Sequence, residues 1–311
     1  MKERKWLIPF VIAMGCLPWL ILFGIVFLGL MVAACGFGGG PVRGDKIALI
    51  HVSGVITGGS GGGGFFEGTS AGAENIIEAL ERARKDKSVK AVVVRIDSPG
   101  GSPAGSQEVY NEILRVRKEG KVVVASMADV AASGGYYIAA ACDKIYANGS
   151  TLTGSIGVIM ETTDMSQLYK KIGLDVNVIK TGKFKDMGSG ARKMTPEERQ
   201  IVAAMLDDTF RQFISAVSQG RKMPESEVRK LADGRVFTGR QAKKLGLVDS
   251  IGGLLDAEKW AASEVGIKGE LKIIEHEKSF LKNLMGSTET RSKVDEALLR
   301  RLLDRAPAIP R

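Results

Sequence analysis

One serine stands out for chemistry because every side chain around it is small. The segment A-A-S-G-G-Y-Y (131–137) places Ser133 between alanines and glycines, at the start of an alanine-rich stretch of helical composition. Small neighbours leave the Ser133 hydroxyl accessible. The positive end of a following helix, together with the Gly134 N–H, would stabilise negative charge forming beside it. The pattern fits a nucleophile, although taken alone it fits a simple helix N-cap better.

A second segment suits the stabilisation of an oxyanion. D-S-P-G-G (97–101) directly follows a valine-rich run. Gly100 and Gly101 allow the backbone to approach a substrate closely and to aim N–H groups at developing negative charge. An ordinary strand-to-helix turn uses the same residue types, so the segment supports both interpretations equally.

The serine needs a base, and histidine is an unpromising source. The chain has 2 histidines, His51 and His276, and neither flanks a candidate nucleophile, so a Ser-His-Asp triad is not expected. A lysine can serve if burial lowers its pKa from about 10.4. Lys183 and Lys185 follow a β-like run at 175–179 and lie beside Gly182. Either lysine fits the role, and the commoner alternative is a solvated pair at a turn.

Other chemistries lack their residue patterns. The chain has no H-E-x-x-H, no C-x-x-C and no G-K-[ST] loop, so we expect no metal site and no cofactor. Its one G-x-S-x-G match, around Ser60, lies in a glycine-rich run at 57–64 that is expected to be a mobile loop, and no buried strand precedes it. The chain has a net charge of +9, but its basic residues are not interleaved with aromatic residues. This pattern favours binding to an anionic membrane surface over binding to nucleic acid.

The predicted elements place these segments where strands end. Valine-rich runs without alternation are typical of strands buried on both faces, and their alternation with helices indicates an α/β fold with a mainly parallel sheet. Cys142, among alanines, is expected to be a small buried residue without a disulfide partner. The expected strands are 46–52, 89–96, 121–126, 144–147 and 247–248, and the expected helices are 71–85, 103–118, one from 133, 195–220 and 238–244.

The N-terminal region predicts a membrane anchor. Residues 6–35 are apolar and uncharged, and a bilayer core about 30 Å thick needs roughly 20 such residues. Three of the first five residues are Lys or Arg, which places the N-terminus in the cytoplasm and the remaining chain outside. A cleaved signal peptide would have a shorter apolar run, of about 7–15 residues. The segment V-A-A-C (32–35) also fits a lipoprotein processing box, in which Cys35 would be lipidated.

The remaining chain divides into three expected parts. Residues 36–45 form a glycine-rich linker, and residues 46–275 form the catalytic domain. Residues 276–311 form a polar tail, which includes an apolar stripe at helical spacing from Val294 to Leu302 that is typical of an interaction helix.

Together the segments resemble the signal peptide peptidase A family in its short form. The resemblance covers residues 46 to about 266 and implies a Clp-protease/crotonase-like fold of repeated β-β-α units. Its six motifs, in order, are D-S-P-G-G (97–101), A-S-G-G-Y-Y (132–137), L-T-G-S-I-G-V (152–158), G-K-F-K-D (182–186), M-T-P-E-E (194–198) and D-G-R-V-F-T-G-R-Q-A (233–242).

The resemblance implies a role for each site residue. Ser133 matches the nucleophile, Lys185 the lysine base, and Ser155 the serine that orients the lysine amine. The oxyanion donors would be the Gly101 and Gly134 N–H groups.

Two further positions bear on the same motif. Gly100 would support the turn that carries Gly101. The family often has Asn where this chain has Asp97, which adds a carboxylate near the site.

The implied function is a membrane-anchored serine endopeptidase that degrades remnant signal peptides without a cofactor. Members resemble one another in forming ring-like homo-oligomers, because one short-form protomer cannot enclose the site. The expected partners are therefore apolar peptides, membrane lipid and further copies of the chain. The alternatives are a peptidase for other membrane or cell-surface proteins, a catalytically silent scaffold, and an acyl-coenzyme A enzyme of the same fold.

Overall fold

The computed structural model describes residues 44–60, 70–267 and 273–275. The expected anchor, nearly all of the expected linker and the expected tail lie outside these residues. Within the described ranges, no helix combines the length and the apolar composition that a membrane crossing requires. Asp45–Arg311 forms one compact unit, and everything below concerns that unit.

A mainly parallel sheet forms the centre of this unit. Its strands run in the order β10-β1-β4-β5-β6-β9, and every pair in that order is parallel. The bounds are β1 (Lys46–Ser53), β4 (Val89–Ser98), β5 (Val122–Ala132), β6 (Lys144–Ala147), β9 (Ser250–Ile251) and β10 (Ile273–Glu275). The predicted α/β class with a mainly parallel sheet is confirmed.

Short strands extend the sheet toward the candidate site. β7 (Leu152–Gly154) continues alongside the last residues of β5 and pairs antiparallel with β8 (Val236–Thr238). β2 (Val55–Thr57) pairs with β3 (Ser70–Gly72), and Ile56 also bridges to Gly101. The carboxyl end of β4 thus lies between β2 on one side and β5 on the other.

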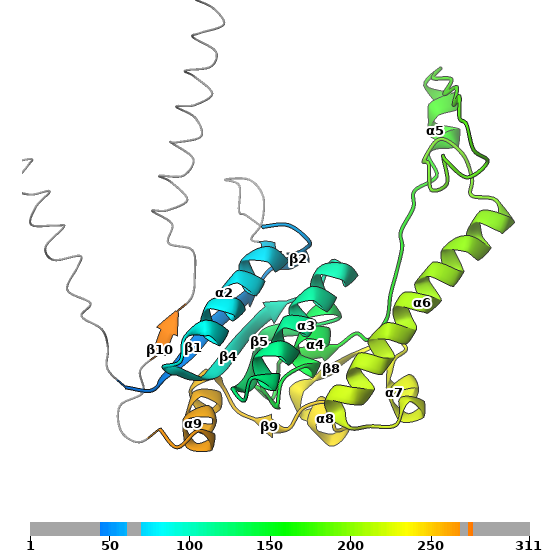
Figure 1. Ribbon diagram of the computed structural model, residues 1–311. Helices are drawn as coiled ribbons and strands as arrows, with labels where there is room; N and C mark the ends of the chain where they lie inside the picture. Colours follow the sequence, from blue (N-terminus) through cyan, green and yellow to red (C-terminus); the bar gives the residue numbers. More distant parts are fainter. Residues whose placement is uncertain (1–43, 61–69, 268–272, 276–311) are drawn as a thin grey trace, which may run out of the picture. The chain divides into compact units, whose positions relative to one another are not determined.

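Helices cover both faces of the sheet. On one face, α2 (Ala73–Lys85), α3 (Pro103–Lys118), α4 (Gly134–Ala140) and α6 (Pro196–Arg221) enclose the larger core, and Figure 1 shows α2 and α3 side by side. On the opposite face, α9 (Leu254–Glu264) packs on alternate residues of β1, β4 and β5. The remaining helices are α5 (Ser166–Lys171), α7 (Glu225–Leu231) and α8 (Gly239–Lys244).

Two strand predictions are wrong for the same physical reason. At 247–248 the N–H groups of Leu247 and Val248 both donate to the Ala242 carbonyl and close the end of α8, so the strand forms only at β9. The run 175–179 is in no strand and is wholly exposed. Strand propensity needs a neighbour with which to pair, and among the residues that the structure describes neither segment has one.

Cys142 behaves as predicted. It is a free cysteine, 1% exposed, at the end of α4, and burial raises the pKa of its thiol.

A close crossing with α6 positions α4, the helix that begins directly after Ser133. α6 passes α4 at Gly220, where an added Cβ would lie 1.8 Å from the Ala140 carbonyl oxygen. No side chain fits at this position without separating the two helices.

We predict that Gly220→Ala lowers the free energy of unfolding by about 1–3 kcal/mol through overpacking, although alanine is the better helix former by about 1 kcal/mol. Denaturant unfolding of the full chain measures this change. Gly59→Ala, at a position with open space around it, serves as the control and should leave stability within about 0.5 kcal/mol. A stability equal to or above that of the parent for Gly220→Ala would contradict the prediction.

Candidate active site

Ser133 occupies the junction between β5 and α4 with an unusual backbone conformation. Its φ is 52° and its ψ is −119°, a region that serine rarely adopts and that costs about 1–3 kcal/mol. The Ser133 N–H donates to the Gly154 carbonyl at 2.9 Å, which ties the turn to β7. The hydroxyl makes no cap hydrogen bond with α4. Ser133 therefore stands at the N-cap position without serving as a side-chain cap.

Three glycines permit this turn by removing side chains where backbones meet. A Cβ at Gly100 would lie 2.8 Å from both the Ser133 Cβ and the Gly134 nitrogen. A Cβ at Gly101 would lie 2.2 Å from a backbone oxygen of β2, and one at Gly134 would lie 2.4 Å from the Ser106 Oγ. A side chain at Gly100 or Gly101 would displace the backbone that surrounds Ser133, and one at Gly134 would displace the Ser106 hydroxyl.

Two glycines beside this junction have backbone N–H groups that the neighbouring helix and strand do not use. Gly134 is the first residue of α4, so its N–H has no acceptor within the helix. The Ile56 N–H donates to the Gly100 carbonyl and the Ser102 N–H donates to the Ile56 carbonyl, each at 2.8 Å. In this parallel pattern Gly101, between the two bonding residues, makes no backbone hydrogen bond with β2, and it lines the cavity described below.

Gly100 supports this arrangement rather than supplying a donor. Its N–H donates to the buried Ser98 Oγ at 3.1 Å, a hydrogen bond within the turn itself. The Asp97 carboxylate accepts the Val130 N–H at 3.1 Å, where the β4–β5 register shifts. An asparagine oxygen at this position would accept the same bond.

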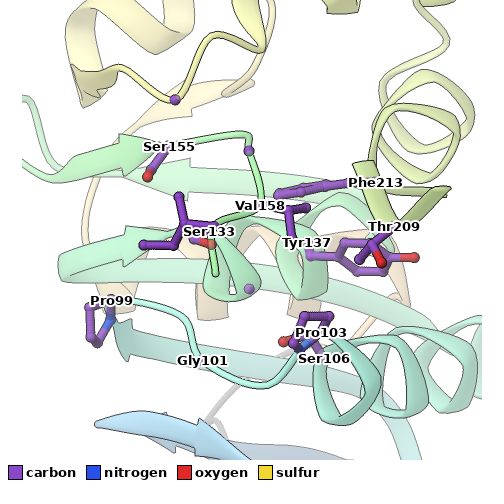
Figure 2. A pocket seen from close by; sticks show the side chains of 14 residues that line it. Pro99, Gly101, Pro103, Ser106, Ser133, Tyr137, Ser155, Val158, Thr209 and Phe213 are labelled. Carbon is purple, nitrogen blue, oxygen red and sulfur yellow. The ribbon is translucent and has the colours of Figure 1, made fainter. Parts of the chain in front are cut away.

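A cavity of about 410 Å³ opens over the junction. Ser133, Ser155, Gly101 and Gly134 all line it. Figure 2 shows the two serines toward one end and the side chains of Tyr137 and Phe213 toward the other. The remaining lining consists mainly of apolar groups, Pro99, Pro103, Val158 and Ile159 among them.

Aromatic rings pack against one another at one end of the cavity. The rings of Tyr137 and Phe213 have centroids 4.9 Å apart, and Tyr137 meets Tyr110 edge to face at 5.2 Å. Burial raises the pKa of Tyr137 to about 12, so its hydroxyl stays neutral at physiological pH. This wall is suited to an apolar side chain.

Ser155 lies beside Ser133 because β7 runs alongside the end of β5. Its φ is 49°, and its N–H donates to the Arg235 carbonyl at 2.9 Å. Two serines with positive φ therefore face one cavity. Sequence reasoning missed two other lining residues, Ser106 and Thr209, because nothing in their sequence surroundings distinguishes them from ordinary helical residues.

Lys185 does not line the cavity of its own chain. It is exposed and belongs to residues 159–195, which we call the arm, none of which is buried. Among the described residues, no lysine lines the cavity. The structure therefore unites Ser133, Ser155 and the three glycines, and leaves Lys185 on a separate surface.

The arm nevertheless distinguishes the two candidate lysines. The Lys183 ammonium forms an ion pair with Glu197 and lies 5.2 Å from the centroid of the Phe184 ring. Within the described part of the chain, no acidic group pairs with the Lys185 ammonium. Lys185 is thus the lysine free to act elsewhere. His51 lies on β1 outside the cavity lining, and His276 lies outside the described residues.

The known proteins to which this chain is similar include several named as proteases. The profile of Peptidase family S49 matches residues 115–268. A Synechocystis sp. protein named as a protease is 42% identical over 244 residues, covering 78% of this chain and 83% of that protein. The chloroplastic serine protease SPPA of Arabidopsis thaliana is 38% identical over 230 residues, covering 74% of this chain and 34% of that protein. Protease 4 of Haemophilus influenzae is 35% identical over 213 residues, 68% of this chain and 34% of that protein.

The strain at Ser133 generates a stability prediction. Glycine adopts positive φ without cost, so Ser133→Gly should be more stable than Ser133→Ala by about 1 kcal/mol or more, while both lose the hydroxyl. Thermal and denaturant unfolding of the two variants measure the difference. A Ser133→Ala variant at least as stable as Ser133→Gly would show that the turn is not strained.

Proposed function

Since this chain belongs to Peptidase family S49 and is a serine peptidase, we propose that it cleaves apolar peptide segments at a membrane through a Ser133–Lys185 dyad. The observation that carries the proposal is that the Ser133 hydroxyl is not engaged as a helix cap and that Ser133 lines a cavity together with Gly101 and Gly134. We propose the N–H groups of these two glycines as the oxyanion donors. The arrangement of the sheet and helices is also consistent with a Clp-protease/crotonase-like fold.

The proposed chemistry is acyl transfer in two steps. Neutral Lys185 takes the Ser133 proton as the Ser133 Oγ attacks the peptide carbonyl, and the Gly101 and Gly134 N–H groups hold the resulting oxyanion. Ser155 accepts or donates a hydrogen bond to orient the lysine amine. Protonated Lys185 then donates to the leaving amine, and water deacylates Ser133. None of these steps calls on a metal or a cofactor.

The proposal requires a second copy of the chain, because Lys185 lies outside the cavity of its own chain. The arm exposes a run of large apolar residues, of which Ile159 is 88% and Ile179 101% exposed. Apolar surface of this extent marks an interaction site. We propose that the arm of one copy delivers Lys185 to the cavity of its neighbour, and that repetition of this head-to-tail contact closes a ring.

The substrate class follows from the cavity and the expected anchor. An apolar lining with aromatic walls favours apolar side chains beside the scissile bond. Remnant signal peptides are apolar and remain in the membrane, where a tethered peptidase meets them at high effective concentration. Attachment through residues 6–35, with the catalytic unit outside the cytoplasm, belongs to the same proposal.

Two alternatives are disfavoured by particular observations. An acyl-coenzyme A enzyme needs cations for the phosphates, and no Lys or Arg among the described residues lines the cavity. A silent scaffold would not need a strained serine in the cavity. A peptidase for other membrane or cell-surface proteins would use the same apolar cavity, and only substrate comparison separates it from the proposed one.

We predict that Ser133→Ala and Lys185→Ala each slow hydrolysis of a fluorogenic apolar peptide by about a thousandfold or more. Lys183→Ala is the matched control, because Lys183 is held by Glu197, and it should retain most activity. Circular dichroism and sedimentation must match the parent, so that lost folding or assembly is not mistaken for lost chemistry. Full activity in Lys185→Ala would remove this lysine as the base.

Mixing the two inactive variants tests delivery between copies. Dissociated and reassembled together in equal amounts, Ser133→Ala and Lys185→Ala chains should recover about a quarter of the parent activity, because chance pairs an intact serine with a neighbour's intact lysine at one contact in four. A mixture as inactive as its components would show that each dyad forms within one chain.

A further inference from the structure

We infer that Arg192 and Lys180 neutralise the Asp186 carboxylate so that Lys185, the residue before Asp186 in the chain, can lose its proton. The inference rests on the proposed function, because it takes Lys185 as the base. It concerns positioning residues on the arm that do not line the cavity.

The geometry around Asp186 is that of a closed ion-pair network. Arg192 donates to both Asp186 oxygens, at 2.9 Å and 2.7 Å, and the Lys180 ammonium lies 2.5 Å from one of them. The other side of the Arg192 guanidinium donates to both Glu198 oxygens, at 2.8 Å and 2.6 Å. The Asp186 side chain is 10% exposed and that of Glu198 is 2% exposed, so little water competes for these bonds.

The network also fixes where the lysine segment sits. Glu198 forms a capping box with Thr195 at the start of α6, accepting the Thr195 N–H at 2.8 Å. Arg192 thereby ties the turn that carries Lys185 to the first residues of a long helix. Bidentate pairing on both sides of one guanidinium specifies this geometry more closely than a single ion pair would.

The charges in the network cancel. Two carboxylates, Asp186 and Glu198, face two cations, Arg192 and Lys180, and Lys183 is balanced by Glu197. The other charged groups of the arm are Glu161, Asp164, Lys170, Lys171, Asp175 and Lys193, and Arg199 follows Glu198 on α6. An uncompensated carboxylate close to an ammonium group favours the protonated form of that group, whereas a neutralised carboxylate does not.

The charge balance of the arm is important because the cavity that Lys185 is proposed to enter has no charged lining residue among those described. The cavity lining includes no Asp, Glu, Lys, Arg or His among the described residues, and its Tyr137 stays neutral. When Lys185 enters the cavity of a neighbouring copy, the charges that accompany it are therefore those of its own arm. Hydrogen bonds from Arg192 and the Thr195 N–H hold the pKa of Glu198 near 2, and the Asp186 pKa is likewise lowered. Both carboxylates stay ionised wherever a lysine would titrate.

The test compares Asp186→Asn with Arg192→Gln in the full, assembled protein. Both substitutions break the same ion pair, but they change the charge beside Lys185 in opposite directions. We expect the rising limb of the profile of kcat/KM against pH to move to lower pH by about half to one unit in Asp186→Asn, and to higher pH by a similar amount in Arg192→Gln. If the network were purely structural, both variants would have lower activity and the rising limb of the pH profile would not move.

Three further variants complete the design. Lys180→Gln removes a cation whose side chain is 31% exposed, and should move the limb to higher pH even if Arg192→Gln fails to fold. Arg192→Lys keeps the positive charge but loses the bidentate hydrogen bonds to Asp186 and Glu198. It should therefore keep the rising limb of the pH profile near its position in the parent, at a reduced kcat. Arg82→Gln, in an exposed pair on α2, is the control and should leave the profile unchanged.

The outcomes separate this inference from the proposed function. Opposite displacements in the carboxylate and cation variants support it. An unmoved limb, or displacement in one common direction, overturns it if Lys185→Ala remains inactive. Activity in Lys185→Ala would instead overturn the assignment of the base, and this inference with it.

Discussion

The backbone of Ser133 is the constraint on which the rest of the site depends. A serine at a φ of 52° is unfavourable, and the surrounding fold must hold it there. The Gly154 carbonyl accepts its N–H, and Gly100 packs against it at a separation that excludes any side chain. The same turn leaves the hydroxyl without a helix-capping bond and places Gly134, the first residue of α4, in the cavity lining. The strain and the uncapped hydroxyl are thus consequences of one backbone conformation.

The parallel sheet explains why these groups meet. β4 and β5 are adjacent and end at the same edge, so the motif after β4 and the serine after β5 become neighbours although they are distant in sequence. β7 alongside β5 adds Ser155. The edge that unites these residues does not include the lysine. The arm that carries Lys185 has no buried residue and exposes apolar surface, which is a reason to expect another copy as its partner.

Local pattern was sufficient for most of the fold. Uninterrupted valine runs predicted β4 and the start of β5, and the helix 103–118 and the capping box at Thr195 were predicted at the positions where the structure has them. The failures at 247–248 and 175–179 share a cause. Strand formation depends on a pairing neighbour, and a sequence window contains no information about whether that neighbour is present. Ser106 and Thr209 escaped notice because only packing makes a helical serine or threonine line a cavity.

The sequence by itself determined the chemical inventory: an accessible serine before a helix, paired glycines after a strand, too few histidines for a plausible triad, and two lysines between which physics could not choose. The tertiary structure decided the rest, because distance, strain and charge balance exist only after folding. It placed Ser155 beside Ser133, gave Gly100 a supporting role, and engaged Lys183 with Glu197 while leaving Lys185 free. It also separated Lys185 from the cavity, since the order of segments along a chain does not reveal which surface each one will occupy.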